Sequence, residues 1–224
     1  MVRNGGPVSR VAVLIPSRGR PESLKGSIQS VLDTASVADV HCWIDSDQQA
    51  DYEAIQANFA GNPRVTFVFG DRVGPVAAAN ELVRLSPGYK AYGLITDDTQ
   101  MVTWGWDAWV LFALESMPLA VISPRHNLGE HVDMPFVSAE WLKIVGWLAC
   151  PVFYHFCWPI LIGLIGEQTA IVHAPEWGFS IHHDGLPHSN TDARTSDEQK
   201  FFHYVALMMP KHVEALRNAM QVAS

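Results

Sequence analysis

Two adjacent carboxylates, Asp97 and Asp98, follow a short apolar run at residues 91–95. The run predicts a buried strand, and the carboxylates stand where that strand ends. Mg²⁺ and Mn²⁺ prefer oxygen ligands, and open α/β sheets bind their ligands at the carboxyl edge of the strands. The pair therefore predicts a divalent metal site, although a solvated turn explains this single segment equally well.

Charged residues follow three earlier predicted strands in the same way. Arg18 and Arg20 follow the first strand, Asp45 and Asp47 follow the second, and Arg72 follows the third. Because the carboxyl ends of parallel strands meet at one edge of a sheet, these side chains are expected to share one cleft. Each alone is a common surface residue, but four such strand ends together indicate a functional site.

The first hundred residues alternate between strand and helix patterns. Right-handed βαβ units follow from this alternation, so we predict a Rossmann-like, mostly parallel sheet with helices on both faces. The predicted strands cover residues 10–15, 40–44, 65–69 and 91–95, and the predicted helices cover 21–33, 49–59 and 75–85.

The second half of the chain is less regular. Helices are expected at 106–117, 139–148, 196–209 and 210–222, strands at 119–123 and within 176–183, and a loop at 184–196. Neither repeats nor a linker interrupt the chain, which favours one domain over residues 1–224. Within it, residues 10–100 would bind a donor, 101–209 would form the metal and acceptor half, and 210–224 a C-terminal helix.

Composition limits the class of protein. The chain has 224 residues, 48% of them hydrophobic, enough for one sizeable core. Its net charge of -8 argues against tight binding to a nucleic-acid backbone. The three cysteines lack the spacing of a disulfide framework or zinc site, and residues 1–10 do not resemble a secretory signal, so we expect a cytoplasmic protein.

Residues 146–166 are apolar over a length that suits a membrane span. Pro151 and Pro159 break helices, however, and His155 is polar, so a buried core or the wall of a cleft is the preferred interpretation. We therefore expect no membrane span.

Several nucleotide-binding and hydrolase signatures are missing. The sequence contains no G-x-G-x-x-G after the first strand, no G-x-x-x-x-G-K-[ST] and no G-x-S-x-G. These absences disfavour dinucleotide oxidoreductases, P-loop NTPases and α/β-hydrolases.

Four segments instead resemble glycosyltransferases of the A-type fold, in particular family-2-like enzymes. Residues 11–21 look like the first strand and nucleotide-receiving loop, and residues 72–80 like the segment that closes over the donor. Residues 96–99, followed by the Gly-Trp-Asp turn at 105–107, resemble the acidic metal motif of small single-domain bacterial and phage transferases.

The resemblance implies a role for each matching residue. A nucleotide-sugar donor of the UDP or GDP type would be bound by Pro16, Ser17, Arg18, Arg20, Asp45, Arg72, Asn80 and Asp97. Mn²⁺ or Mg²⁺ would be held by Asp98 with a late histidine, either His182 or His183. The usual Asp-x-Asp is absent, so Asp97 and Asp98 would divide ribose and metal contacts.

The same resemblance implies transfer of the sugar to an acceptor hydroxyl, with a base that deprotonates it. The acidic residue usual near a histidine such as His155 is missing, which leaves Asp133, Glu140 and Glu167 as candidates and leaves inversion or retention open. The acceptor would lie against residues 134–147 and the apolar stretch after them. A phage context would make a hydroxylated DNA base a conceivable acceptor.

Three other functions remain compatible with the sequence. The histidines and aspartate at 182–184 form an H-x-D arrangement, which an Fe(II) oxygenase or a metal-dependent hydrolase would use. Such oxygenases are normally antiparallel barrels, which the βαβ pattern contradicts. A nucleotidyltransferase shares the sheet type but needs a longer Gly-rich loop, and a non-catalytic sugar-nucleotide-binding relative would explain the incomplete metal motif.

Overall fold

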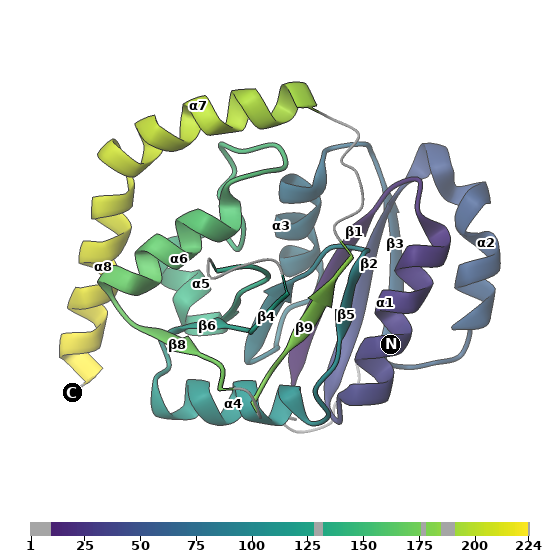
Figure 1. Cartoon of the computed structure of the whole chain (residues 1–224), viewed down its shortest axis with the longest axis horizontal. Helices are drawn as coiled ribbons and strands as arrows, with labels where there is room; N and C mark the ends of the chain where they lie inside the picture. Colours follow the sequence, from purple (N-terminus) through teal and green to yellow (C-terminus); the bar gives the residue numbers. More distant parts are fainter. Residues whose placement is uncertain (1–9, 128–131, 176–177, 185–190, 224) are drawn as a thin grey trace.

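A seven-stranded sheet forms the centre of the computed structural model, which describes residues 10–127, 132–175, 178–184 and 191–223. Its strand order is β3-β2-β1-β4-β7-β6-β8 (Figure 1). The first four run parallel, and β7 runs antiparallel to its neighbours β4 and β6. The strands are β1 (Val11–Ser17), β2 (Ala38–Asp45), β3 (Val65–Gly70), β4 (Ala91–Leu94), β6 (Val121–Ser123), β7 (Phe136–Ser138) and β8 (Ile171–His173).

The parallel half follows the predicted alternation of strand and helix. Helices α1 and α2 lie on one side of β1, β2 and β3, and α3 lies on the other (Figure 1). Pro21 and Pro75 stand in the first turns of α1 and α3, where a missing N–H has no helical partner to lose. The predicted α/β fold is thus confirmed for this half. Its helices are α1 (Pro21–Thr34), the 3-10 turn η1 (Ser46–Gln48), α2 (Gln49–Asn58) and α3 (Pro75–Leu85).

The second half departs from that alternation. The two strands β5 (Thr99–Met101) and β9 (Ile181–His183) leave the main sheet and pair with each other as an antiparallel ribbon. The strand predicted within 176–183 therefore exists as β9, but it belongs to this ribbon. Strands β5, β7 and β8 have three residues each, too few for a clear sequence pattern.

An aromatic cluster joins the two halves of the core. Phe136, Trp106 and Phe179 are fully buried, with ring centroids 5.1–5.4 Å apart. Gly93 on β4 makes room for this cluster, because a Cβ there would lie 2.2 Å from the Phe136 ring. Close packing of this kind fixes how β7 lies against β4.

The Gly-Trp-Asp turn has a structural role at the start of α4 (Trp106–Ser116). Gly105 has a φ of 74°, which glycine adopts without strain. Trp106 donates its indole N–H to the Thr34 hydroxyl, at 3.1 Å. The buried Asp107 carboxylate accepts from the backbone amides of Val37 and Ala38. The motif therefore ties α4 to the turn between α1 and β2.

The apolar stretch at 146–166 divides into a loop and a helix. Helix α5 (Ala139–Val145) ends at Gly146, the loop runs to Cys157, and α6 (Trp158–Gln168) follows. Pro159 lies in the first turn of α6, so it starts the helix instead of breaking it. Among the described residues, no helix combines the length and apolarity that crossing a membrane requires.

Two helices complete the chain. Helix α7 (Thr191–Leu207) crosses the top of the molecule in Figure 1, and α8 (Met209–Ala223) descends from it against α5 and α6. The predicted loop at 184–196 was wrong from residue 191 onward, and residues 185–190 lie outside the described part.

Candidate functional site

A cavity of about 440 Å³ opens at the carboxyl edge of β1, β2 and β4. Its size suits a small organic ligand. The described residues that line it include eight predicted site residues from four different strand ends. The lining consists of Pro16, Ser17, Arg18, Arg20, Trp43, Asp45, Arg72, Gly74, Pro75, Ala78, Thr96, Asp97, Asp98, Tyr154 and His155.

Asp98 and His183 meet because of the register between β5 and β9. Asp98 precedes β5 directly, and Thr99 pairs with His183 across the ribbon. His183 Nε2 lies 3.1 Å from Asp98 Oδ1, and both side chains are buried. Asn127 fixes the backbone of His183 by hydrogen bonds of 2.8 and 3.0 Å to its N–H and C=O. Residues 85 positions apart thus form one polar pair.

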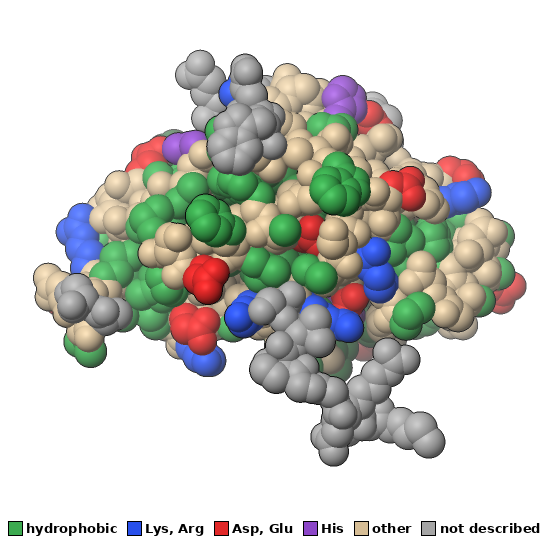
Figure 2. Space-filling model, turned by 90° about the horizontal axis from the view of Figure 1, so that it is seen from below, with side chains coloured by type: hydrophobic (Ala, Val, Ile, Leu, Met, Phe, Trp, Pro, Cys, Tyr) green, Lys and Arg blue, Asp and Glu red, His purple; other side chains and the backbone are tan. Residues whose placement is uncertain are grey.

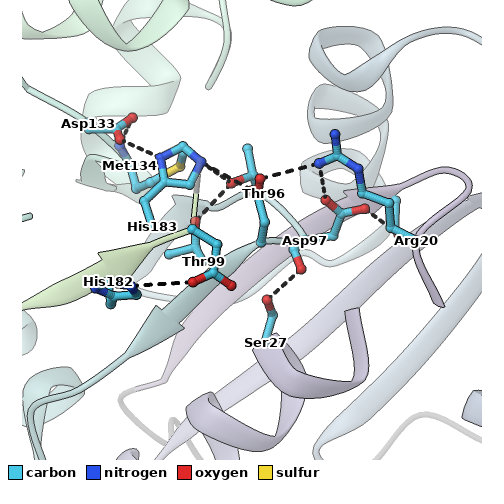
Figure 3. Close-up of polar contacts among 12 residues, drawn as sticks. Arg20, Ser27, Thr96, Asp97, Thr99, Asp133, Met134, His182 and His183 are labelled. Carbon is cyan, nitrogen blue, oxygen red and sulfur yellow. Dashed lines mark hydrogen bonds and ion pairs between the residues drawn. The ribbon is translucent and has the colours of Figure 1, made fainter. Parts of the chain in front are cut away.

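His183 lies between the carboxylates of Asp133 and Asp98, and Figure 3 shows its contact with Asp133. Its Nδ1 lies 3.3 Å from Asp133 Oδ2, on the side opposite Asp98. The hydrogen bonds to Asp133 and Asp98 raise the pKa of His183 to about 9, against the effect of burial. Burial alone raises the pKa of Asp98, but hydrogen bonds from His183 and Thr96 and the charges of His183 and Arg20 bring it well below its usual value.

Asp97 faces a different set of partners. Its carboxylate accepts a hydrogen bond of 2.7 Å from Ser17, and its backbone carbonyl accepts one of 2.8 Å from Ser27. Arg20 approaches both Asp97 and Asp98, at 3.4 and 3.3 Å. Burial raises the pKa of Asp97 more than Ser17 and Arg20 lower it. The adjacent carboxylates therefore differ in their ease of ionisation.

Asp45 and Arg18 meet at another part of the cavity. Arg18 donates to Asp45 at 2.8 Å and binds both oxygens of Asp47, at 2.6 and 2.7 Å. Asp45 is buried, whereas Asp47 is exposed and does not line the cavity. Trp43 lies on the same face of β2 as Asp45, because the two are separated by one residue. This alternation is the signal that would have found Trp43.

His183 and Asp133 are not part of the cavity lining, and they join the site through the contact of His183 with Asp98. Four further predicted site residues lie outside both the lining and these contacts. His182 points to the opposite side of β9, is exposed, and lies 3.3 Å from Asp184. Glu140 is exposed beside Lys143 on α5, and Glu167 is exposed on α6. Asn80 uses its side chain to bind the backbone of residues 148–149. None of the four lines the cavity.

The position of Asn80 gives a testable expectation. Asn80→Ala is expected to lower the free energy of unfolding by about 2 kcal/mol, because two amides and a carbonyl of residues 148–149 lose their partner. Urea unfolding measures this, with the exposed Asn58→Ala as the matched control. Loss of nucleotide affinity without loss of stability would instead support the predicted role of Asn80 in binding the donor.

One wall of the cavity comes from the apolar stretch that was expected to form a core or the wall of a cleft. Tyr154 and His155 come from the loop before α6, which had only been assigned to the core or to a cleft wall as a whole. Gly74, which directly precedes α3, lines the cavity beside Tyr154. The resemblance drew attention to His155 but assigned it no contact, and no sequence pattern marks Tyr154, because the place of both depends on how the loop folds against α7.

Asp98 and His183 form a pair that fits a divalent cation. Among the described residues, no group of three or more His, Cys, Asp and Glu side chains could hold a metal ion. Two protein ligands nevertheless suit a cation that takes its other ligands from phosphate oxygens and water. Asp133 at Nδ1 is the type of partner that orients a metal-binding histidine.

Comparison with known proteins gives matches by structure only. No protein-family model and no curated protein matches the chain. The structure of GalNAc-T7 with UDP, GalNAc and Mn²⁺ is similar over 91% of this chain and 48% of that chain, with a TM-score of 0.69 and 9% identity. Staphylococcus aureus TarS 1–349 with UDP is similar over 77% and 60%, with a TM-score of 0.58 and 10% identity.

A third similar structure is mannosyltransferase PcManGT from Pyrobaculum calidifontis with GDP-Man and Mn²⁺. It matches over 95% of this chain and 74% of that chain, with a TM-score of 0.58 and 13% identity. The chain therefore spans about half of GalNAc-T7 and 60% of TarS 1–349, but most of PcManGT. At these identities the likeness concerns the fold, and on that ground the chain has the A-type fold of glycosyltransferases.

Proposed function

We propose that this chain is a divalent-metal-dependent glycosyltransferase that moves a sugar from a nucleoside diphosphate to an acceptor hydroxyl. The pairing of buried Asp98 with His183 at the edge of a 440 Å³ cavity carries this proposal. Arg18, Arg20 and Arg72 also line the cavity, and arginines recognise phosphate by charge-assisted hydrogen bonds. The UDP and GDP-Man in similar structures support a nucleotide donor.

Each group has a distinct part in this proposal. Asp98 and His183 would hold the cation, and Asp133 would keep His183 oriented. The cation would neutralise the charge that develops on the leaving diphosphate. Arg20 would contact the same phosphates, since it already lies beside both Asp97 and Asp98. Asp45 would accept hydrogen bonds from the nucleoside at the other part of the cavity.

None of the three candidates for the catalytic base that the sequence offered lines the cavity. Asp133 is buried against His183, and Glu140 and Glu167 lie outside the cavity lining. Proton transfer requires hydrogen-bond reach of the acceptor hydroxyl. None of the three is therefore proposed as the base. The choice between inversion and retention is tested by the anomeric configuration of the product, read by NMR.

A thermal-shift screen tests the proposed function directly. UDP, GDP, CDP, ADP and dTDP are each added with Mn²⁺ and, separately, with EDTA. A ligand at a hundred times its dissociation constant stabilises the native state by about 2.7 kcal/mol. We expect one nucleotide to raise the melting temperature only with Mn²⁺. The absence of any Mn²⁺-dependent shift would contradict the proposal.

Turnover separates an enzyme from a non-catalytic sugar-nucleotide-binding relative. UDP-GalNAc and GDP-mannose serve as probes, and release of the nucleoside diphosphate is measured with and without Mn²⁺. Binding without release of nucleotide in the presence of varied acceptors would favour the non-catalytic alternative. The oxygenase alternative loses support because the two H-x-D residues, His182 and Asp184, are both exposed and lie outside the cavity lining.

Asp45→Ala tests the nucleoside contact. We expect the dissociation constant of the nucleoside diphosphate to rise about tenfold or more, because hydrogen bonds with a charged partner contribute about 1.5–3 kcal/mol. The turnover number should change less. Isothermal titration calorimetry measures the affinity, and Asp47→Ala is the control, since Asp47 shares Arg18 but lies outside the cavity lining. Unchanged affinity would refute the role of Asp45.

For the acceptor, a hydroxylated base in DNA is the candidate that a phage context would suggest. The net charge is -8, and acidic and basic side chains are interspersed on the face in Figure 2. Filter binding to hydroxylated and unmodified duplexes at low salt tests the idea, because phosphate contacts weaken with salt. Binding to neither duplex would eliminate a DNA acceptor.

A further inference from the structure

The loop between α5 and α6, residues 150–157, forms part of the cavity wall and is here called the wall loop. Tyr154 and His155 from this loop line the cavity. The Tyr154 ring packs over Gly74, where an added Cβ would lie only 2.6 Å from a ring carbon. The wall loop thus touches the start of α3, which forms another part of the lining.

The backbone of the wall loop is bound by one side chain from α7. Asp197 has no exposed surface, and its carboxylate accepts from three consecutive amides. The Tyr154 amide lies 2.9 and 3.1 Å from its two oxygens, and those of His155 and Phe156 lie 2.8 Å from Oδ2. These contacts cross more than 40 residues of sequence.

A carboxylate is suited to this task by its charge and its two oxygens. The three amides lie in a segment without helix or strand pairing, so buried N–H groups there need an acceptor. Hydrogen bonds from amides to a carboxylate are stronger than those between neutral groups. Lys200, one turn further along α7, lies 3.8 Å from Asp197 and offsets its charge. Asp197 therefore connects α7 to the cavity wall.

We propose that Asp197 is a positioning residue, which fixes the wall loop and thereby places Tyr154 and His155 against the substrate. Its catalytic consequence rests on the proposed function, whereas its effect on the loop does not. The side chain of Asp197 is buried away from the cavity lining, so it acts only through the backbone it binds. A displacement of about 1 Å in a positioned group can lower the rate about a hundredfold.

Asp197→Asn tests the anchor with little change of volume. The amide keeps one acceptor oxygen but loses the charge, and its NH₂ group faces the amide donors of the loop. Hydrogen exchange, read by mass spectrometry, is expected to be at least about tenfold faster at residues 154–156, which corresponds to about 1.4 kcal/mol. Glu198→Gln is the control, because Glu198 is exposed on the same helix and pairs with Arg194.

The catalytic arm uses release of nucleotide from UDP-GalNAc or GDP-mannose. Asp197→Asn is expected to lower kcat by about a hundredfold, while the affinity for the nucleoside diphosphate changes by less than about threefold. In a Tyr154→Ala/His155→Ala background the same substitution should lower kcat by less than about threefold, because the two side chains through which Asp197 is proposed to act are absent. Glu198→Gln should leave both quantities unchanged.

These outcomes test the positioning role of Asp197 and the proposed transferase function separately. Unchanged exchange at residues 154–156 in Asp197→Asn, or faster exchange with an unchanged kcat, would overturn the positioning role. An equal loss of kcat in the Tyr154→Ala/His155→Ala background would overturn it as well. If the unmodified chain neither binds nor turns over any nucleotide, the proposed function fails, and the exchange result alone decides whether Asp197 anchors the wall loop.

Discussion

Asp98→Ala is expected to abolish Mn²⁺-dependent turnover, with a loss of about a thousandfold or more. Asp98 is the carboxylate that His183 and Arg20 both approach, at 3.1 and 3.3 Å. Its removal would leave the cation with His183 as its remaining proposed protein ligand. The cation would then bind more weakly, and the charge on the leaving diphosphate would be less well neutralised. Release of nucleoside diphosphate from the donor measures the loss, and the Mn²⁺-dependent thermal shift should disappear with it.

The fold should survive this substitution with lower stability, because Asp98 directly precedes β5 and contributes little apolar contact, but His183 and Arg20 lose a charged partner. Far-UV circular dichroism checks that point. Asp184→Ala is a matched control, since Asp184 is a carboxylate at the end of β9 that pairs with exposed His182. Retained turnover in Asp98→Ala would remove Asp98 from the metal site, and an equal loss in Asp184→Ala would assign the effect to the ribbon instead.

His183→Gln and His182→Gln are expected to differ sharply although the residues are neighbours. His183 is buried between Asp98 and Asp133, whereas His182 is exposed on the other face of β9. We expect His183→Gln to lower Mn²⁺-dependent turnover about a hundredfold, as removal of one metal contact or its orienting partner does. His182→Gln should retain nearly full activity, and equal effects would refute the assignment.

The pH dependence of stability gives a second measurement on the same pair. The folded pKa of His183 is raised to about 9 from 6.5, so protonation stabilises the folded state. At about 1.4 kcal/mol per pKa unit, the contribution is roughly 3 kcal/mol. It is fully present below pH 6.5 and is lost as the pH rises through about 9.

The melting temperature of the metal-free chain should therefore fall between pH 6.5 and about 9. His183→Gln should lose this part of the pH dependence, and His182→Gln should keep it. Metal binding requires the neutral imidazole, so Mn²⁺ affinity should rise over the same range. A metal-free melting temperature that does not change over this range in the unmodified chain would show that His183 is not charged by its two carboxylates.

Much of the first half could be predicted from local pattern. Each strand there is followed by a helix long enough to show a buried face, and Pro21 and Pro75 mark the first turns of α1 and α3. The parallel arrangement then follows from the handedness of the connections. This is why Arg20, Asp45 and Asp98 were expected at one edge, where the structure brings them together.

The second half resisted prediction for a different reason. Strands β5 to β9 all have three residues, which gives a weak periodic signal, and no strand was expected at β5, β7 or β8. Pro159 was counted against a helix although it begins one. Polar residues from 191 onward suggested a loop, whereas tertiary contacts stabilise α7, among them the bonds from Asp197 to the wall loop.

The sequence by itself determined the parallel α/β unit and the types of side chain at its strand ends, because both follow from patterns within short segments. Only the tertiary structure decided which histidine joins Asp98, since a shift of one residue in the register of β5 and β9 would exchange His183 for His182. The tertiary structure also decided that the Asn80 side chain accepts a hydrogen bond from the backbone of residues 148–149, and that the Asp197 carboxylate accepts from the amides of the wall loop. Such partners lie more than 40 residues apart, and local sequence carries no record of contacts over that distance.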